Sequence, residues 1–144
     1  MAADDSVDPE LAELRARRLE QLVRQRSAAE AADRAPPVPE DLTSASYAEF
    51  LRRNPHAVVD VWAPWCGPCR TMAPILEGLA RELSPSVRFG KLNADEEPAI
   101  AGGWNVQAIP TLLLFDGGRL VDRVVGALPA APLRERLRRV FRLS

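Results

Sequence analysis

The segment from Val58 to Arg70 constrains the fold of this chain more than any other. It reads Val-Val-Asp-Val-Trp-Ala-Pro-Trp-Cys-Gly-Pro-Cys-Arg and holds both cysteines of the 144-residue chain. Apolar and β-branched residues over 57–62 predict a buried strand, and Pro64 ends it. The Cys-X-X-Cys follows where a helix should begin. The two sulfurs are therefore predicted to lie at a strand-to-helix junction of an α/β fold.

This placement predicts different roles for the two cysteines. Unpaired backbone N–H groups at a helix N-terminus stabilise a nearby anion, so they favour the thiolate of Cys66, which we predict to be the nucleophile. Cys69 lies one turn deeper and can form a disulfide with Cys66 after little backbone movement, which makes it the expected resolving thiol. Gly67 lets a partner backbone approach closely, and Pro68 is tolerated in the first helical turn.

Several separated motifs resemble the thioredoxin family. The match runs from about Leu42 to Leu143, and its residues are Trp62–Arg70, Asp60, Pro74, Lys91–Asn93, Ile109–Thr111 and Val125–Ala127. The resemblance implies a thioredoxin fold, which is an α/β fold with a central mixed β-sheet flanked by helices on both faces. It also implies a protein-disulfide reductase, with an active site of the Trp-Cys-Gly-Pro-Cys type.

The pattern along the chain predicts the elements of this fold in order. An edge strand near 38–42 should be short or missing, because three prolines surround it. Ser46 and Glu49 have capping-box spacing in a helix predicted over 44–53. The remaining expected elements are strands over 57–62, 87–93, 111–115 and 120–125, a hairpin turn at 116–118, and helices after Cys66, over 95–104 and over 130–143.

Two domains are predicted: an N-terminal helical extension with a proline-rich linker over 1–40, and the thioredoxin domain over 41–144. The extension should be helical from about Asp8 to Ala32, with a narrow apolar stripe among arginines. Such a helix is marginal alone. Its simplest interpretation is a solvated helix, and the alternative is a docking element for a partner or a second copy of the chain.

Asp60 is an acid between two valines on a predicted central strand, where a carboxylate is costly unless it is paired or functional. It either forms a structural hydrogen bond or faces outward at a strand end, or it has a pKa raised by burial and accepts the proton of Cys69 through a water. The resemblance points to the second role. Lys91 is the only lysine of the chain and lies on the neighbouring predicted strand, so it would be the electrostatic partner of Asp60.

The resemblance also predicts a substrate-binding surface. The residue matching Pro110 is cis in this family and faces the cysteines, so Pro110 and the backbone of Ile109 would form a ledge for an extended substrate segment. Trp65, Val125 and Gly126 would complete the apolar rim with Ile109. We include Gly67 and Pro68 among the substrate-binding residues.

Composition excludes several other functions. The net charge of −1 gives no reason to expect nucleic-acid binding, and no apolar run is long enough to cross a membrane. The N-terminus is acidic and lacks a secretory apolar run, so we expect a cytoplasmic protein. We also expect a monomer. Zinc needs about four ligands, and the only other soft candidate is His56, so neither a metal nor a bound cofactor is expected.

The sequence thus predicts a thiol-disulfide oxidoreductase that reduces disulfide-containing proteins and is regenerated by a thioredoxin reductase. One alternative is a disulfide oxidant or isomerase, which the Gly-Pro between the cysteines argues against. Another is a binding module that grips a partner regardless of redox state, and the N-terminal helix is the feature that would support it.

Overall fold

A computed structural model describes the backbone of residues 8–34 and 37–144, and the side chains of these residues outside 28–34. The chain divides into two compact units, Met1–Ala35 and Pro36–Ser144. β1, the first strand, begins at Glu40. The division into domains over 1–40 and 41–144 stays a prediction.

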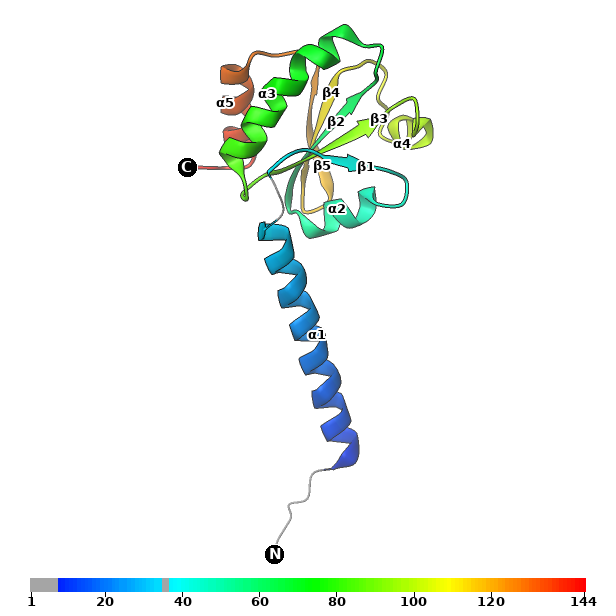
Figure 1. Cartoon of the computed structure of the whole chain (residues 1–144), viewed down its shortest axis with the longest axis vertical. Coiled ribbons are helices and arrows are strands. Elements are labelled where there is room, and N and C mark those ends of the chain that lie inside the picture. The colour runs from blue at the N-terminus through cyan, green and yellow to red at the C-terminus, as the bar shows by residue number, and fades with distance from the viewer. Residues whose placement is uncertain (1–7, 35–36) are drawn as a thin grey trace, which may run out of the picture. The chain divides into compact units, whose positions relative to one another are not determined.

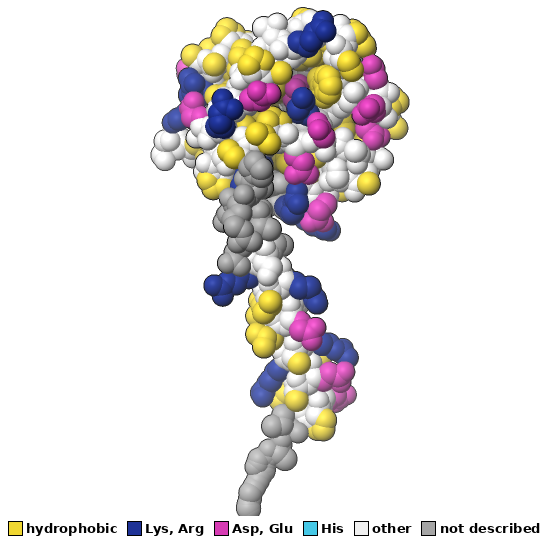
Figure 2. Space-filling view, viewed as in Figure 1, with side chains coloured by type: hydrophobic (Ala, Val, Ile, Leu, Met, Phe, Trp, Pro, Cys, Tyr) yellow, Lys and Arg dark blue, Asp and Glu magenta, His cyan; other side chains and the backbone are white. Residues whose placement is uncertain are grey.

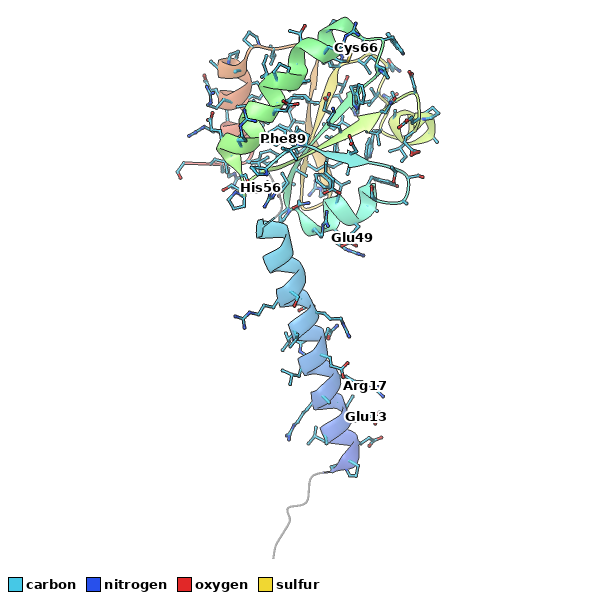
Figure 3. The ribbon with its side chains drawn as sticks, in the orientation of Figure 1. Glu13, Arg17, Glu49, His56, Cys66 and Phe89 are labelled. Atoms are coloured by element: carbon cyan, nitrogen blue, oxygen red, sulfur yellow. A yellow bond between two sulfur atoms is a disulfide. The ribbon has the colours of Figure 1, made fainter. Side chains whose placement is uncertain are left out.

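The described residues of the first unit form one helix, α1 (Pro9–Arg34), as the sequence predicts. Its first turn is capped by Asp8, whose Oδ1 accepts a hydrogen bond from Glu10 N at 3.0 Å. An ion pair one turn apart joins Glu13 to Arg17 on its surface (Figure 3). A second such pair joins Glu20 to Arg24. Figure 2 shows its hydrophobic side chains dispersed among charged ones, and the largest are exposed: Leu11, Leu14, Leu19, Leu22 and Val23. The helix therefore lacks a broad apolar face.

The second unit contains a five-stranded sheet with the order β1-β3-β2-β4-β5. The strands are β1 (Glu40–Leu42), β2 (His56–Trp62), β3 (Arg88–Asn93), β4 (Thr111–Asp116) and β5 (Arg119–Val125). β3 pairs parallel with β1 and with β2, whereas β4 pairs antiparallel with β2 and with β5. The mixed sheet predicted from the sequence is thus confirmed, and its first strand is short.

Helices cover both faces of this sheet (Figure 1). They are α2 (Tyr47–Arg53), α3 (Gly67–Leu83), α4 (Pro98–Gly103) and α5 (Ala130–Val140). Side chains alternate along each strand, so Val58 packs in the core under α3 and α5, while Val59 and Val61 pack in the core under α2 and α4. Asp60 follows Val58 by two residues and therefore faces α3. None of the described helices is long and apolar enough to cross a membrane.

Two helix starts differ from the predictions. The helix expected from residue 44 begins at Tyr47, and the Ser46 side chain makes no capping bond to it. Instead Ser46 Oγ accepts a hydrogen bond from Thr43 N at 2.9 Å, and Glu49 pairs with Arg52, so the predicted capping box is wrong.

The helix predicted over 95–104 is also shorter, because α4 begins only at Pro98. Asn93 folds the residues just before Pro98 into a turn, in which the Asn93 Oδ1 accepts a hydrogen bond from Asp95 N at 2.9 Å. The last helix, predicted over 130–143, ends at Val140.

Candidate active site

Cys66 and Cys69 are joined by a disulfide at the N-terminus of α3. Figure 3 labels Cys66 there. Cys66 is the N-cap residue, and its Sγ accepts a hydrogen bond from Cys69 N at 3.3 Å. Pro68 lies in the first turn of the helix, as predicted. The side chains are only 4% (Cys66) and 3% (Cys69) exposed. The helix terminus therefore directs an N–H group at the sulfur of Cys66.

Trp65 precedes the first cysteine and is 68% exposed, which is unusual for so large an apolar side chain. Its indole N–H donates to both carboxylate oxygens of Asp95, at 3.0 Å and 3.3 Å. Asp95 is held in turn by the Asn93 turn described above. The exposed ring is thus fixed at one edge by a hydrogen bond to its polar atom.

Asp95 was not predicted from the sequence. Its contact with Trp65 depends on the tertiary pairing of Asn93 with Trp62, where two parallel strands end. An acid two residues beyond such a strand end is well placed to reach a side chain that follows the neighbouring strand.

Asp60 lies beside Lys91 on the neighbouring parallel strand, since the two are register partners. Asp60 is 3% exposed, and its Oδ1 has no hydrogen-bond partner among the described residues. Burial raises the pKa of Asp60 from 3.8 to about 7, and the charge of Lys91 opposes this rise. Asp60 can therefore exchange a proton near neutral pH.

The ammonium of Lys91 has an aromatic contact as well. Its Nζ lies 4.7 Å from the centroid of the Trp62 ring, within the range of a cation–π interaction. Trp62 itself packs against the buried cluster of Ala63, Cys66 and Cys69. Lys91 thus connects the buried acid to the aromatic residue under the disulfide.

A second loop, at the start of β4, reaches the disulfide. The Ile109–Pro110 peptide bond is cis, as the resemblance predicts, and Ile109 packs against the buried cluster that contains both cysteines. Pro110 O accepts a hydrogen bond from Gly126 N at 2.8 Å. Gly126 has a φ of 91°, which favours glycine, and Val125 before it is 62% exposed. The structure thus brings Ile109, Pro110 and Gly126 together beside the cysteines.

Two other residues, one of them the histidine considered as a metal ligand, lie away from this site. His56 is at the opposite end of β2 (Figure 3), where it stacks on Phe141 with ring centroids 4.9 Å apart. Trp104 packs edge-on against Tyr47. In the parts of the chain that the structure describes, no group of three or more His, Cys, Asp or Glu side chains is placed to hold a metal ion.

A buried Cys-X-X-Cys disulfide at a helix N-terminus, with an acid of raised pKa on the adjacent strand, defines a thiol-disulfide oxidoreductase. The sequence model of the Thioredoxin family matches residues 38–139. The chain belongs to the thioredoxin family and is a protein-disulfide reductase that acts by dithiol-disulfide exchange.

Similar proteins agree with this assignment. The chain is 41% identical over 97 residues to a thioredoxin of Pyropia yezoensis, covering 67% of this chain and 91% of that protein. It is 43% identical over 89 residues to thioredoxin 1 of a Nostoc species, covering 62% of this chain and 83% of the relative. Among solved structures, a mutant thioredoxin from Halobacterium salinarum superposes with a TM-score of 0.68 at 29% identity, covering 73% of this chain and 92% of that one.

Proposed function

We propose that Cys66 attacks one sulfur of a substrate disulfide and that Cys69 resolves the product. The first attack breaks the substrate S–S bond, forms a mixed disulfide with Cys66 and releases one substrate thiolate. Cys69 then attacks Cys66 Sγ, which releases the second substrate thiolate and leaves the Cys66–Cys69 disulfide. Two electrons pass from the dithiol to the substrate.

The single observation that carries this assignment is the asymmetry between the two sulfurs. Cys66 Sγ accepts a backbone N–H bond at the helix N-terminus, whereas Cys69 lies inside the first turn of α3. An N–H group directed at a sulfur stabilises its thiolate, which is the attacking form. This supports Cys66 as the nucleophile and Cys69 as the resolving thiol.

Asp60 is proposed to take the proton of Cys69 during resolution. A general base works best when its pKa lies near the operating pH, and the pKa of about 7 for Asp60 meets this condition. Its buried Oδ1 has no partner in the described part of the chain, so it is available to a water that links it to Cys69. Lys91 would adjust the pKa of this acid through its charge.

Substrates are proposed to dock beside the disulfide on two segments of the chain. One is formed by Trp65, Gly67 and Pro68, and the other by Ile109, Pro110, Val125 and Gly126. Pro110 has no N–H, and its carbonyl is already bonded to Gly126, so an extended substrate would pair with the backbone of Ile109. The exposed Trp65 and Val125 supply apolar contacts on either side of it.

The partners are disulfide-containing proteins and a reductase that regenerates the dithiol, as the family implies. We further propose a cytoplasmic monomer. This proposal rests on the sequence alone, and relatives include a spinach protein named as a chloroplastic thioredoxin.

Trapping of the mixed disulfide tests the two roles. The Cys69→Ser variant should be recovered linked to substrate proteins through Cys66, because attack remains possible and resolution does not. Cys66→Ser is the matched control and should trap little. The measurement is the amount of reductant-sensitive adduct on non-reducing gels, and equal trapping by both variants would refute the assignment.

A further inference from the structure

Arg123 lies on β5, two residues before Val125, and its side chain reaches the end of α4. Its Nη2 donates to Trp104 O at 2.9 Å, and its Nη1 donates to Asn105 O at 3.2 Å. The planar guanidinium thus binds two successive carbonyls, which a lysine ammonium cannot do with the same geometry.

The first of these carbonyls, Trp104 O, closes a helix, and Asn105 O follows directly after it. Trp104 is the C-cap of α4, and Asn105 adopts the left-handed conformation with a φ of 58°. The last carbonyls of a helix lack partners within it, and a cation there also interacts favourably with the helix dipole. Arg123 therefore fixes the point at which the chain leaves α4 and turns toward the disulfide.

The segment that starts there is the one that carries the proposed substrate ledge. It runs from Trp104 to Pro110, and its far end is held by the hydrogen bond from Gly126 N to Pro110 O at 2.8 Å. Arg123 and Gly126 are three residues apart at the C-terminal end of β5. Residues 123–126 consequently hold the 104–110 segment at both of its ends.

The carboxylate next to Arg123 does not compete with these two carbonyls for its guanidinium. The adjacent carboxylate, Asp122, is occupied by Arg136, whose Nε and Nη2 donate to it at 2.8 Å and 2.9 Å. In the described part of the chain, Arg123 has no carboxylate within 4.0 Å. Its bonds to the two carbonyls are therefore charge-assisted and not shared with an ion pair.

We propose that Arg123 is a positioning residue that fixes the 104–110 segment so that the backbone of Ile109 can pair with an extended protein substrate. The inference rests on the proposed docking function of that segment. Ordering a loop during binding reduces affinity, so a preorganised ledge favours the binding of protein substrates. A small disulfide that does not lie along the ledge gains nothing from Arg123.

The test compares two substrates on the full chain. Arg123→Gln removes the charge and the planar pair of guanidinium donors, whereas Arg123→Lys keeps the charge. Arg119→Gln is a matched control at an exposed arginine of the same strand. The pre-reduced proteins react with insulin and with cystine, and the insulin reaction is also followed in steady state with dithiothreitol as the reductant. Amide hydrogen exchange is measured over residues 105–109.

For Arg123→Gln with insulin, we expect kcat/KM to fall about tenfold, mainly through a higher KM. The reason is that the 104–110 segment binds the substrate equally in the ground state and in the transition state. The cystine rate should stay within about twofold, and the loop amides should exchange faster. Arg123→Lys should recover part of the insulin activity, and Arg119→Gln should match the wild type.

Three outcomes would overturn the inference. An insulin KM for Arg123→Gln equal to that of the wild type shows that the ledge does not depend on this residue. An equal loss with insulin and with cystine indicates general destabilisation. If the wild type reduces neither substrate, the proposed function itself fails together with the inference, whereas the first two outcomes leave that function intact.

Discussion

Asp60 is a carboxylic acid that the fold keeps protonated to unusually high pH. The folded chain holds this proton up to about pH 7, whereas the ordinary pKa is 3.8. The folded state therefore binds more protons between these values, and its free energy of unfolding must fall as the pH rises through them. The difference between 3.8 and about 7 corresponds to a loss of about 4 kcal/mol at most.

Asp60→Asn should remove this loss while keeping a side chain of similar shape. We expect the oxidised variant to be more stable than the oxidised wild type at pH 8.5, by about 2–4 kcal/mol, and the difference to shrink steadily toward pH 4. Urea unfolding at a series of pH values measures it. A difference that does not vary with pH would show that the pKa of Asp60 is not raised.

Lys91 offers a second prediction at the same site. Its charge lowers the pKa of Asp60, so Lys91→Met should raise that pKa further. If Asp60 must be ionised to accept the proton of Cys69, the acid limb of the pH-rate profile for resolution should move to higher pH in this variant. Lys91→Arg keeps a charge and serves as the control. A profile for Lys91→Met that overlays the wild type would exclude the electrostatic role.

Residues of this site differ in how far the sequence could predict them. Cys66 and Cys69 form a local motif, and Asp60 is conspicuous because it interrupts an apolar strand, so one segment was enough to find all three. Asp95 and Arg123 act through contacts with residues 30 and 19 positions away along the chain. Such contacts depend on the tertiary arrangement, which no local pattern contains.

At the scale of elements, Gly90 controls how closely β1 and α2 approach β3. A Cβ added at this residue would lie 2.6 Å from Leu42 Cδ1 and 3.2 Å from Phe50 Cε2. Both neighbours are buried core residues, so they have little room to move. The absence of a side chain at Gly90 therefore lets Leu42 of β1 and Phe50 of α2 pack directly against β3.

Gly90→Ala should consequently reduce the free energy of unfolding by about 1–3 kcal/mol through overpacking. Gly78→Ala is the matched control, because nothing lies within 4 Å of the added atom and the residue is inside α3. The control should instead stabilise the domain by about 0.5–1 kcal/mol. Thermal or urea unfolding compares the two, and a neutral Gly90→Ala would mean that the edge rearranges freely.

The elements themselves were predicted best where burial dominates. Continuous apolar runs located β2 and β4, since a strand buried on both faces needs them. Helix starts were predicted less well, because the Ser46 hydroxyl can bond either forward to the helix or back to Thr43, and the chain uses the second option. Turn chemistry at Asn93 similarly displaced the start of α4.

At the scale of the whole molecule, the strand order could not come from periodicity. Alternating patterns predict strands but do not say that β3 lies between β1 and β2. The resemblance to the thioredoxin family predicted a central mixed sheet and the meeting of the Cys66 and Pro110 segments, and the structure supplies the strand order. The N-terminal extension has no counterpart in the matched region, 38–139, so its helix had to be predicted from capping and composition alone.

The last prediction concerns this extension. Every residue assigned to the chemistry or to docking belongs to the unit Pro36–Ser144, which also contains the cores that hold the sheet and helices together. The described ion pairs of α1 join residues of that same helix, and its large apolar side chains are exposed. A chain that begins at Pro36 should therefore fold and keep most of its reductase rate. Insulin reduction and urea unfolding of the truncated and full chains measure this directly. A loss of more than about tenfold in kcat/KM, which corresponds to about 1.4 kcal/mol of barrier, would make the helix part of the active unit and favour a docking role for it.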